Sequence, residues 1–270
     1  MNTIPKTLTI AGSDSSGGAG LQADLKTFEE YGTYGLTAIT SIVTMDPDNG
    51  WSHGVTAIDP LLLKQQIKTA TAGGEIAAMK TGMLPNVEII KIVKETLENG
   101  DIKNIVIDPV MVCKGEAEVL NPENADALRD MLIPLATVAT PNLFEAGVLS
   151  GMGKLKGLED MKEAAVKICA LGAKSVVIKG GKSLENGDAI DLFYDGKEFE
   201  VFSLPKLPTN NNHGAGCTFA AAVAAGLATG LSVRDAVCKA KDFAYAAIKH
   251  GFAFNQYVGP VYHAAYRLCK

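Results

Sequence analysis

The sequence predicts a three-layer α/β/α protein in which helices cover both faces of a mostly parallel central sheet. Short β-branched and apolar runs alternate with segments of helical periodicity along almost the whole chain. Alternation of this kind is typical of parallel sheets that are covered on both faces. With 270 residues, 47% of them apolar, the chain can bury a substantial core, so we expect one domain over residues 1–270.

The expected strands are short and end at glycine, proline or polar residues. They occupy residues 7–11, 37–43, 77–83, 104–110, 137–140 and 175–178. Helices are expected between them because apolar residues recur three or four positions apart, as at Leu21, Leu25 and Phe28. The order of the elements therefore places the strands side by side, with helical connections crossing the faces of the sheet.

The last third of the chain breaks this rhythm once. Within residues 191–202, the pair Asp195-Gly196 lies between two strand-like runs, which predicts a late β-hairpin at an antiparallel edge. Two long helices follow. The first begins near Gly214, and the second begins with a capping pattern at Ser232.

The composition excludes several classes of protein. With 25 Lys and Arg against 30 Asp and Glu, the net charge is -5, which argues against nucleic-acid binding. The five cysteines are widely spaced without a C-x-x-C pair, and His53, His250 and His263 show no metal-ligand spacing. No apolar run reaches the ~18 residues of a membrane span, and residues 1–6 carry no signal peptide. We therefore expect a cytoplasmic protein with reduced thiols and no membrane partner.

A glycine-rich loop at residues 12–20 follows the first strand and opens a helix. In a parallel sheet such a loop lies at the carboxyl ends of the strands, where ligands bind. It matches neither the dinucleotide fingerprint nor the Walker motif. An ordinary strand-to-helix turn explains the loop equally well, so taken alone it leaves both interpretations open.

A second glycine-rich segment, residues 210–218, opens the alanine-rich helix. Gly214, Ala215 and Gly216 would leave free N–H groups at the positive end of the helix dipole, which suits an anion. Cys217 would lie in the first turn, where the dipole lowers the pKa of a thiol. The alternative is close helix packing around an inert core thiol, and we favour the functional interpretation because glycines and cysteine coincide.

Three further strand ends carry polar groups. Asp108 ends one strand and leads into a loop with Cys113, and a lysine with two glycines, residues 179–181, ends another. Asn142 and Glu145 follow a third strand, where they could support Mg²⁺ through water. The same pair also fits a helix capping box, which is the better interpretation of that pair alone.

Together these segments resemble the ribokinase-like superfamily and, within it, the hydroxymethylpyrimidine and phosphomethylpyrimidine kinases. The resemblance extends over nearly the whole chain. It rests on the motifs AGSDSSGGAGLQADLKTF, KTGML, VIDPVM, TPNLFEA, VIKGG, HGAGCTFAAA and VGPVYH. It implies a ribokinase-like fold, ATP and Mg²⁺ as cofactors, and a homodimer.

Two positions depart from the pyrimidine kinases and resemble the pyridoxal kinase branch of the family. Met45 stands where the pyrimidine kinases usually carry a glutamine that binds the polar edge of the ring. Cys113 lies in a loop that usually lacks cysteine, and in this branch that cysteine adds reversibly to the substrate aldehyde as a hemithioacetal. The resemblance therefore implies phosphorylation of the 5′-hydroxymethyl group of pyridoxal, and also of pyridoxine or pyridoxamine.

The resemblance also implies roles for individual residues. Cys217 would act as the base, Cys113 as its partner on a closing lid, and Gly214, Ala215 and Gly216 as the anion hole. The residues near the substrate would be Gly12, Asp24, Met45, Met83, Val110 and His213. Those near ATP would be Asn142, Lys179, Gly180, Gly181, Gly214 and Lys239, with Asp108 and Glu145 near the metal.

Two alternatives stay open at this point. A hydroxymethylpyrimidine kinase of thiamine biosynthesis, or an enzyme with both activities, would share the fold and the anion hole. A non-catalytic vitamin-binding protein would keep the fold but not the chemistry, and the intact segment from Gly214 to Cys217 argues against it.

Overall fold

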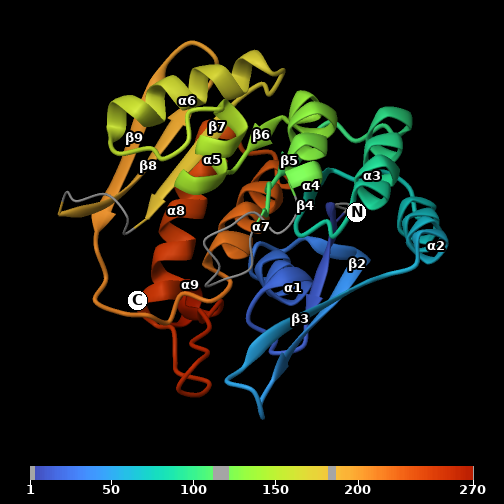
Figure 1. Cartoon of the computed structure of the whole chain (residues 1–270), viewed down its shortest axis with the longest axis horizontal. Coiled ribbons are helices and arrows are strands. Elements are labelled where there is room, and N and C mark those ends of the chain that lie inside the picture. The colour runs from blue at the N-terminus through green and yellow to red at the C-terminus, as the bar shows by residue number, and fades with distance from the viewer. Residues whose placement is uncertain (1–3, 112–121, 182–186, 270) are drawn as a thin grey trace.

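The computed structural model describes residues 4–111, 122–181 and 187–269, and within these ranges the strands form one nine-stranded sheet (Figure 1). The strands are β1 (Lys6–Asp14), β2 (Tyr34–Asp46), β3 (Ser52–Ala57), β4 (Ala78–Thr81), β5 (Ile105–Ile107), β6 (Val138–Ala139), β7 (Val176–Gly181), β8 (Asp188–Tyr194) and β9 (Phe199–Pro205). Their order is β3-β2-β1-β4-β5-β6-β7-β8-β9. Neighbours from β2 to β7 run parallel, whereas β3 at one edge and β8 and β9 at the other are antiparallel.

Helices cover both faces of this sheet. They are α1 (Gly20–Glu30), α2 (Pro60–Thr71), α3 (Val87–Asn99), α4 (Pro122–Ala127), α5 (Leu143–Ser150), α6 (Leu158–Ala170), α7 (Ala215–Ala228), α8 (Val233–Lys249) and α9 (Ala265–Leu268). Helices α2 to α6 enclose one apolar core with the sheet, and α1, α7 and α8 enclose a second core (Figure 1). In the described ranges, no helix is both long and apolar enough to cross a bilayer.

The predicted three-layer α/β arrangement and the late hairpin, β8–β9, are confirmed. The opposite edge was missed, because β3 forms a second hairpin with β2. Almost all of β3 is exposed, so its sequence lacks the alternation of buried and exposed residues that predicts a strand. Pairing with β3 also explains why β2 runs on to Asp46, three residues beyond its predicted end.

The parallel order gathers polar residues at one edge of the sheet. Because the carboxyl ends of parallel strands meet at the same edge, the ends of β1, β5 and β7 bring Asp14, Asp108 and Lys179 together. The connections after β4 and β6 add Gly82 and Asn142 to this edge. The start of α7 packs against the same strands, since α7 contacts β1, β4 and β5.

Candidate active site

A cavity of about 400 Å³ opens at this edge of the sheet. It is lined by Gly12, Asp14, Ala19, Gly20, Val43, Met45, His53, Gly82, Met83, Asp108, Val110, Asn142, Glu145, Lys179, Asn212, His213, Gly214, Ala215, Gly216 and Cys217. A second cavity of about 530 Å³ adjoins it and shares Asn142, Lys179, Asn212, Ala215 and Gly216. The two cavities therefore meet at the first turn of α7.

Most of the residues predicted from the sequence line these two cavities. The first cavity contains Gly12, Met45, Met83, Asp108, Val110, Asn142, Glu145, Lys179, His213, Gly214, Ala215, Gly216 and Cys217. The second adds Gly180 and Gly181. The five strand ends thus converge as the sheet topology requires, and the shared residues connect the two cavities.

Asp24 does not lie where it was expected. Its side chain is fully buried on the inner face of α1 and forms an ion pair with Lys80, with 3.1 Å between Nζ and both carboxylate oxygens. It is absent from the lining of both cavities, so the expected contact with the substrate ring is wrong. A further predicted residue, Cys113, lies outside the described residues.

Lys239, which was expected near ATP, lines neither cavity, whereas Lys241 lines the second one. Lys239 Nζ lies 4.5 Å from the centre of the Tyr31 ring. Two residues along a helix correspond to a rotation of about 200°, so the two lysines face opposite sides of α8. Lys241 Nζ donates to Asp191 Oδ2 at 2.9 Å, and Gly180 N–H donates to Asp191 Oδ1 at 3.1 Å.

The first turn of α7 has the form of an anion hole. Gly214 caps the helix at φ 83°, a left-handed conformation that favours glycine. A Cβ at Gly214 would also collide with the carbonyl oxygen of Gly18. The Ala215 N–H is already engaged, since it donates to Asn212 O at 3.1 Å. The next two amides of this turn lack acceptors within the helix and are the ones available to an anion.

The Cys217 thiol is less acidic than its helix position predicts. Burial raises its pKa to about 11, and the carboxylates of Asp24 and Asp108 add to this effect. Lys80 and the Gly20 N–H act in the opposite direction but do not outweigh burial. The expectation of an acidic thiol is therefore wrong, and at neutral pH the thiol is mostly protonated.

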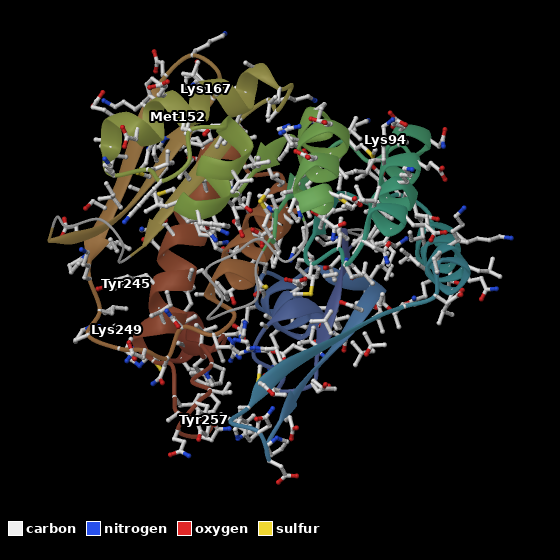
Figure 2. The ribbon with its side chains drawn as sticks, in the orientation of Figure 1. Lys94, Met152, Lys167, Tyr245, Lys249 and Tyr257 are labelled. Carbon is white, nitrogen blue, oxygen red and sulfur yellow. The ribbon has the colours of Figure 1, made fainter. Side chains whose placement is uncertain are left out.

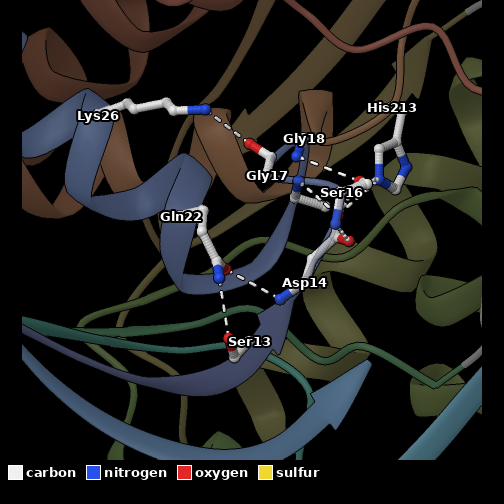
Figure 3. Close-up of polar contacts among 9 residues, drawn as sticks. Ser13, Asp14, Ser16, Gly17, Gly18, Gln22, Lys26 and His213 are labelled. Atoms are coloured by element: carbon white, nitrogen blue, oxygen red, sulfur yellow. Dashed lines mark hydrogen bonds and ion pairs between the residues drawn. The ribbon is translucent and has the colours of Figure 1, made fainter. Parts of the chain in front are cut away.

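A carboxylate clamp joins residues 15–19 of the glycine-rich loop to the segment before α7. Ser16 N–H donates to Asp14 Oδ1 at 2.8 Å, and Ala19 N–H donates to Oδ2 at 2.9 Å. His213 Nε2 lies 2.7 Å from the same Oδ2, and Figure 3 shows His213 beside Ser16 and Asp14. Burial alone would raise the pKa of Asp14, but the hydrogen bonds from His213 and Ser16 lower it to about 2. Asp14 is thus a charged anchor between two loops of the site.

A second polar cluster lies where the two cavities meet. Asp108 Oδ1 accepts hydrogen bonds from Lys179 Nζ at 2.9 Å and from Thr140 Oγ1 at 3.0 Å. Asn142 and Glu145 form the predicted capping box, with reciprocal bonds of 2.9 and 2.8 Å. Burial raises the pKa of Glu145 to about 7, Lys179 opposes this and Asp108 adds to it. Two carboxylates with a shared lysine suit the binding of phosphates and a cation.

The outer wall of the first cavity comes from the hairpin that the sequence did not predict. His53 of β3 pairs with Met45 of β2, and both line the cavity. The hairpin tip is fixed by an edge-on contact between Trp51 and Phe254, with ring centres 5.8 Å apart. Tyr257 lies at the same end of the molecule (Figure 2). His53 could not be recognised from spacing, because its position depends on this missed strand pair.

His263 supports the first turn of α7 from behind. It is buried, and its Nε2 lies 2.9 Å from the hydroxyl of Thr218, the residue after Cys217. Burial lowers the pKa of His263 to about 4, and Lys26 lowers it further, whereas Glu30 opposes the shift. His263 is therefore neutral at physiological pH.

The chain is similar to known kinases over its whole length. It matches the phosphomethylpyrimidine kinase family over residues 14–262. It is 58% identical to the pyridoxine kinase of Bacillus subtilis over 266 residues, 98% of each chain. It is also 39% identical to the hydroxymethylpyrimidine/phosphomethylpyrimidine kinase of the same organism over 265 residues, 98% of this chain and 97% of the relative.

Solved structures lead to the same group of proteins. The Bacillus subtilis pyridoxal kinase, in complex with ADP, has a TM-score of 0.96 at 57% identity, covering 98% of this chain and 100% of that one. The Staphylococcus aureus pyridoxal kinase, in complex with AMP-PCP and pyridoxal, has a TM-score of 0.95 at 51% identity, covering 100% and 97%.

Proposed function

This chain belongs to the phosphomethylpyrimidine kinase family, and we propose that it is an ATP-dependent pyridoxal kinase. The 5′-hydroxymethyl oxygen of pyridoxal bonds to the γ-phosphorus while the bond to the β–γ bridging oxygen breaks, giving pyridoxal 5′-phosphate and ADP. The observation that carries the proposal is the meeting of two cavities at the first turn of α7. The full-length similarity to pyridoxine and pyridoxal kinases supports it.

We assign the first cavity to the vitamin. Its walls include the apolar side chains of Val43, Met45, Met83 and Val110, which suit the faces of an aromatic ring. Met45 offers no strong hydrogen bond to the amino group of an aminopyrimidine. His53 is the polar group on the same wall and is our candidate for contact with a ring substituent. This lining favours a pyridine over an aminopyrimidine.

We assign the second cavity to ATP. Gly180 and Gly181 offer bare backbone beside the buried cation of Lys241. The shared border carries Lys179 and the first turn of α7, so the terminal phosphate would reach the amides of Gly216 and Cys217. Charge that develops on the transferred group meets donors already fixed in place, which is how phosphoryl transfer is mainly accelerated.

The residues at the border of the cavities also fit Mg²⁺. Asp108 and Glu145 present carboxylate oxygens, the ligand type that Mg²⁺ prefers. The pKa of Glu145 is raised mainly by burial, and the neighbouring charge of Asp108, which a cation would offset, raises it further. When bound, the ion would neutralise charge on the phosphates. Lys179 already balances part of the charge of Asp108 and would stay beside the phosphates.

We propose Cys217 as the group that takes the hydroxyl proton. It lies on the floor of the vitamin cavity, directly at the anion hole. Only the thiolate can accept the proton, and the raised pKa leaves a small thiolate fraction at neutral pH. The rate of the chemical step should therefore rise with pH through the alkaline range, as long as the protein stays folded.

The proposal is tested by side-by-side turnover of pyridoxal, pyridoxine and hydroxymethylpyrimidine with ATP. We expect the highest kcat/KM with pyridoxal. The second candidate, a hydroxymethylpyrimidine kinase, is favoured by the matched family itself, and much faster turnover of hydroxymethylpyrimidine would establish it instead. Binding of pyridoxal and ATP without any turnover would identify a non-catalytic vitamin-binding protein.

The role of Cys113 has its own test. If Cys113 adds to the aldehyde as a hemithioacetal, Cys113→Ala should harm turnover of pyridoxal more than turnover of pyridoxine, which has no aldehyde. Equal losses with both substrates would exclude this role.

We further propose that residues 1–270 form one domain and that the protein acts in the cytoplasm as a homodimer. Light scattering of the purified chain would test the homodimer.

A further inference from the structure

A fully buried ion pair lies beneath the site, and the chemistry described above does not use it. Lys80 of β4 and Asp24 of α1 both have 0% exposure. Besides both contacts with Lys80, the Asp24 carboxylate accepts a hydrogen bond of 2.6 Å from Thr9 Oγ1. Burying two charges costs several kcal/mol per ion, and apolar replacements are often no less stable. Stability alone is therefore a weak explanation for this pair.

The sheet register places the pair under the anion hole. Thr9 of β1 pairs with Lys80 of β4, so both side chains point to the same face of the sheet. Ala78, two residues before Lys80, belongs to the core formed with α1 and α7, so this is the face that those helices cover. Helix α7 packs directly on β4 and α1. Cys217, in the first turn of α7, is therefore above the pair.

The cationic end of the pair lies next to the cavity wall. A Cβ added to Gly82, which lines the vitamin cavity, would be 3.2 Å from Lys80 Nζ. Thr9, which pairs with Lys80 within the sheet, holds the carboxylate of Asp24 against the lysine through its hydroxyl. The ammonium group of Lys80 therefore lies directly behind the backbone of Gly82, which separates it from the vitamin cavity.

We propose that the Lys80–Asp24 pair is a positioning device for Cys217, in which the lysine favours the ionised thiol and the aspartate holds the lysine in place. The proposal rests on the proposed kinase function for its catalytic consequence, but not for its effect on the thiol. Lys80 is a positioning residue, because it acts through Cys217 and is sealed from the substrate.

The charges around the thiol agree with this assignment. Among the described residues, Lys80 and Lys179 favour the thiolate of Cys217, while Asp24 and Asp108 oppose it. Among these charges the effect of Lys80 on the thiol is the largest. Asp24 in turn raises the pKa of Lys80, which burial alone would lower, so the lysine stays charged throughout the neutral range.

The test removes both charges at once and reads the thiol directly. In Lys80→Gln/Asp24→Asn the buried groups remain polar but neutral, so no unpaired charge is left in the core. The rate of alkylation of Cys217 by iodoacetamide is followed by mass spectrometry of its peptide at mildly alkaline pH. Because only the thiolate reacts, a rise of half a pKa unit lowers this rate about threefold.

We expect the alkylation of Cys217 to slow up to about threefold, because Lys80 acts on the thiol more strongly than the opposing Asp24 and its loss outweighs the loss of the carboxylate. We expect kcat to fall similarly, while KM for both substrates changes by less than about twofold. Cys169 is an internal reference, because burial also raises its pKa to about 11 and it lies in α6, on the opposite face of the sheet. The surface pair Arg267→Gln/Glu30→Gln, which removes a 2.9 Å ion pair from the same helix as Asp24, is the matched control.

Unchanged alkylation of Cys217 in a folded Lys80→Gln/Asp24→Asn protein would overturn the proposal and leave the pair a purely structural role. If the amide pair does not fold, Lys80→Met/Asp24→Leu tests the same expectation, since apolar residues often replace buried ion pairs without loss of stability. A wild-type protein without kinase activity would overturn the proposed function, and the alkylation rates would still decide the role of the pair.

Discussion

His263 allows a quantitative test of how the C-terminal segment supports the site. It is 6% exposed and hydrogen-bonded to Thr218 behind the first turn of α7. Since burial lowers the pKa of His263 in the folded chain to about 4, the unfolded chain, with an ordinary value near 6.5, binds the proton more tightly. Protonation therefore favours unfolding. The stability that His263 supports is complete above about pH 6.5 and is lost as the pH falls towards 4.

The magnitude follows from these two pKa values. At about pH 5 the imidazole is almost fully protonated in the unfolded chain but only about one-tenth protonated in the folded chain. With 1.36 kcal/mol per pKa unit, this difference lowers the free energy of unfolding by about 2 kcal/mol relative to pH 7.5. His263→Gln keeps a polar partner for Thr218 and removes the titration, so the variant should lack this part of the pH dependence.

The assay is urea unfolding of wild type and His263→Gln at about pH 7.5 and pH 5, with carboxylate effects common to both proteins. We expect the wild type to lose about 2 kcal/mol more than the variant between the two pH values. His250→Gln is the matched control, because His250 is exposed at the end of α8, and it should follow the wild type. Equal pH dependence of wild type and His263→Gln would refute the reasoning.

Four further substitutions and one control, Lys239→Met, test the site. Gly214→Ala should abolish most activity and cost about 1–3 kcal/mol of stability, because its φ of 83° disfavours a side chain and the added Cβ meets a neighbouring carbonyl oxygen; kcat and a melting curve check this. Asp14→Asn should weaken the clamp by about 1–3 kcal/mol, because an amide has one acceptor oxygen and no charge; hydrogen exchange of the glycine-rich loop would show faster opening. Lys241→Met should raise KM for ATP, whereas Lys239→Met on the same helix should leave it within about twofold. Cys217→Ser should lower kcat by about 10²-fold with KM little changed, and an unaltered kcat would remove Cys217 from the chemistry.

The parts of the site that could be predicted depend on local chemistry. Strand ends, the capping box at Asn142 and the glycine at the start of α7 are specified by residues only a few positions apart. The order of strands and helices then implied that these ends share one edge of the sheet. For this reason the anion hole and the polar residues Asp108 and Lys179 could be placed near one another before the fold was known.

The errors concern properties that depend on tertiary packing. Helix position alone predicts an acidic thiol at Cys217, but burial has the opposite effect and is larger. Asp24 lies on a predicted helix, yet only the register of β1 and β4 shows that this carboxylate faces Lys80. His53 was missed because β3 is an exposed edge strand whose partner, rather than its own pattern, makes it a strand.

The clamp between Asp14 and His213 joins residues 199 positions apart in the chain. Contacts of such long sequence separation form late in folding, because the intervening loop must first be ordered. During synthesis the N-terminal residues leave the ribosome first, and β1 can pair with β2 and β4 long before the first turn of α7 has been made. The nascent chain can therefore build most of its parallel sheet while it still lacks an anion hole. Catalytic competence would then begin only when the last fifth of the protein docks, so a chain truncated before Gly214 would be inactive even where its sheet has formed.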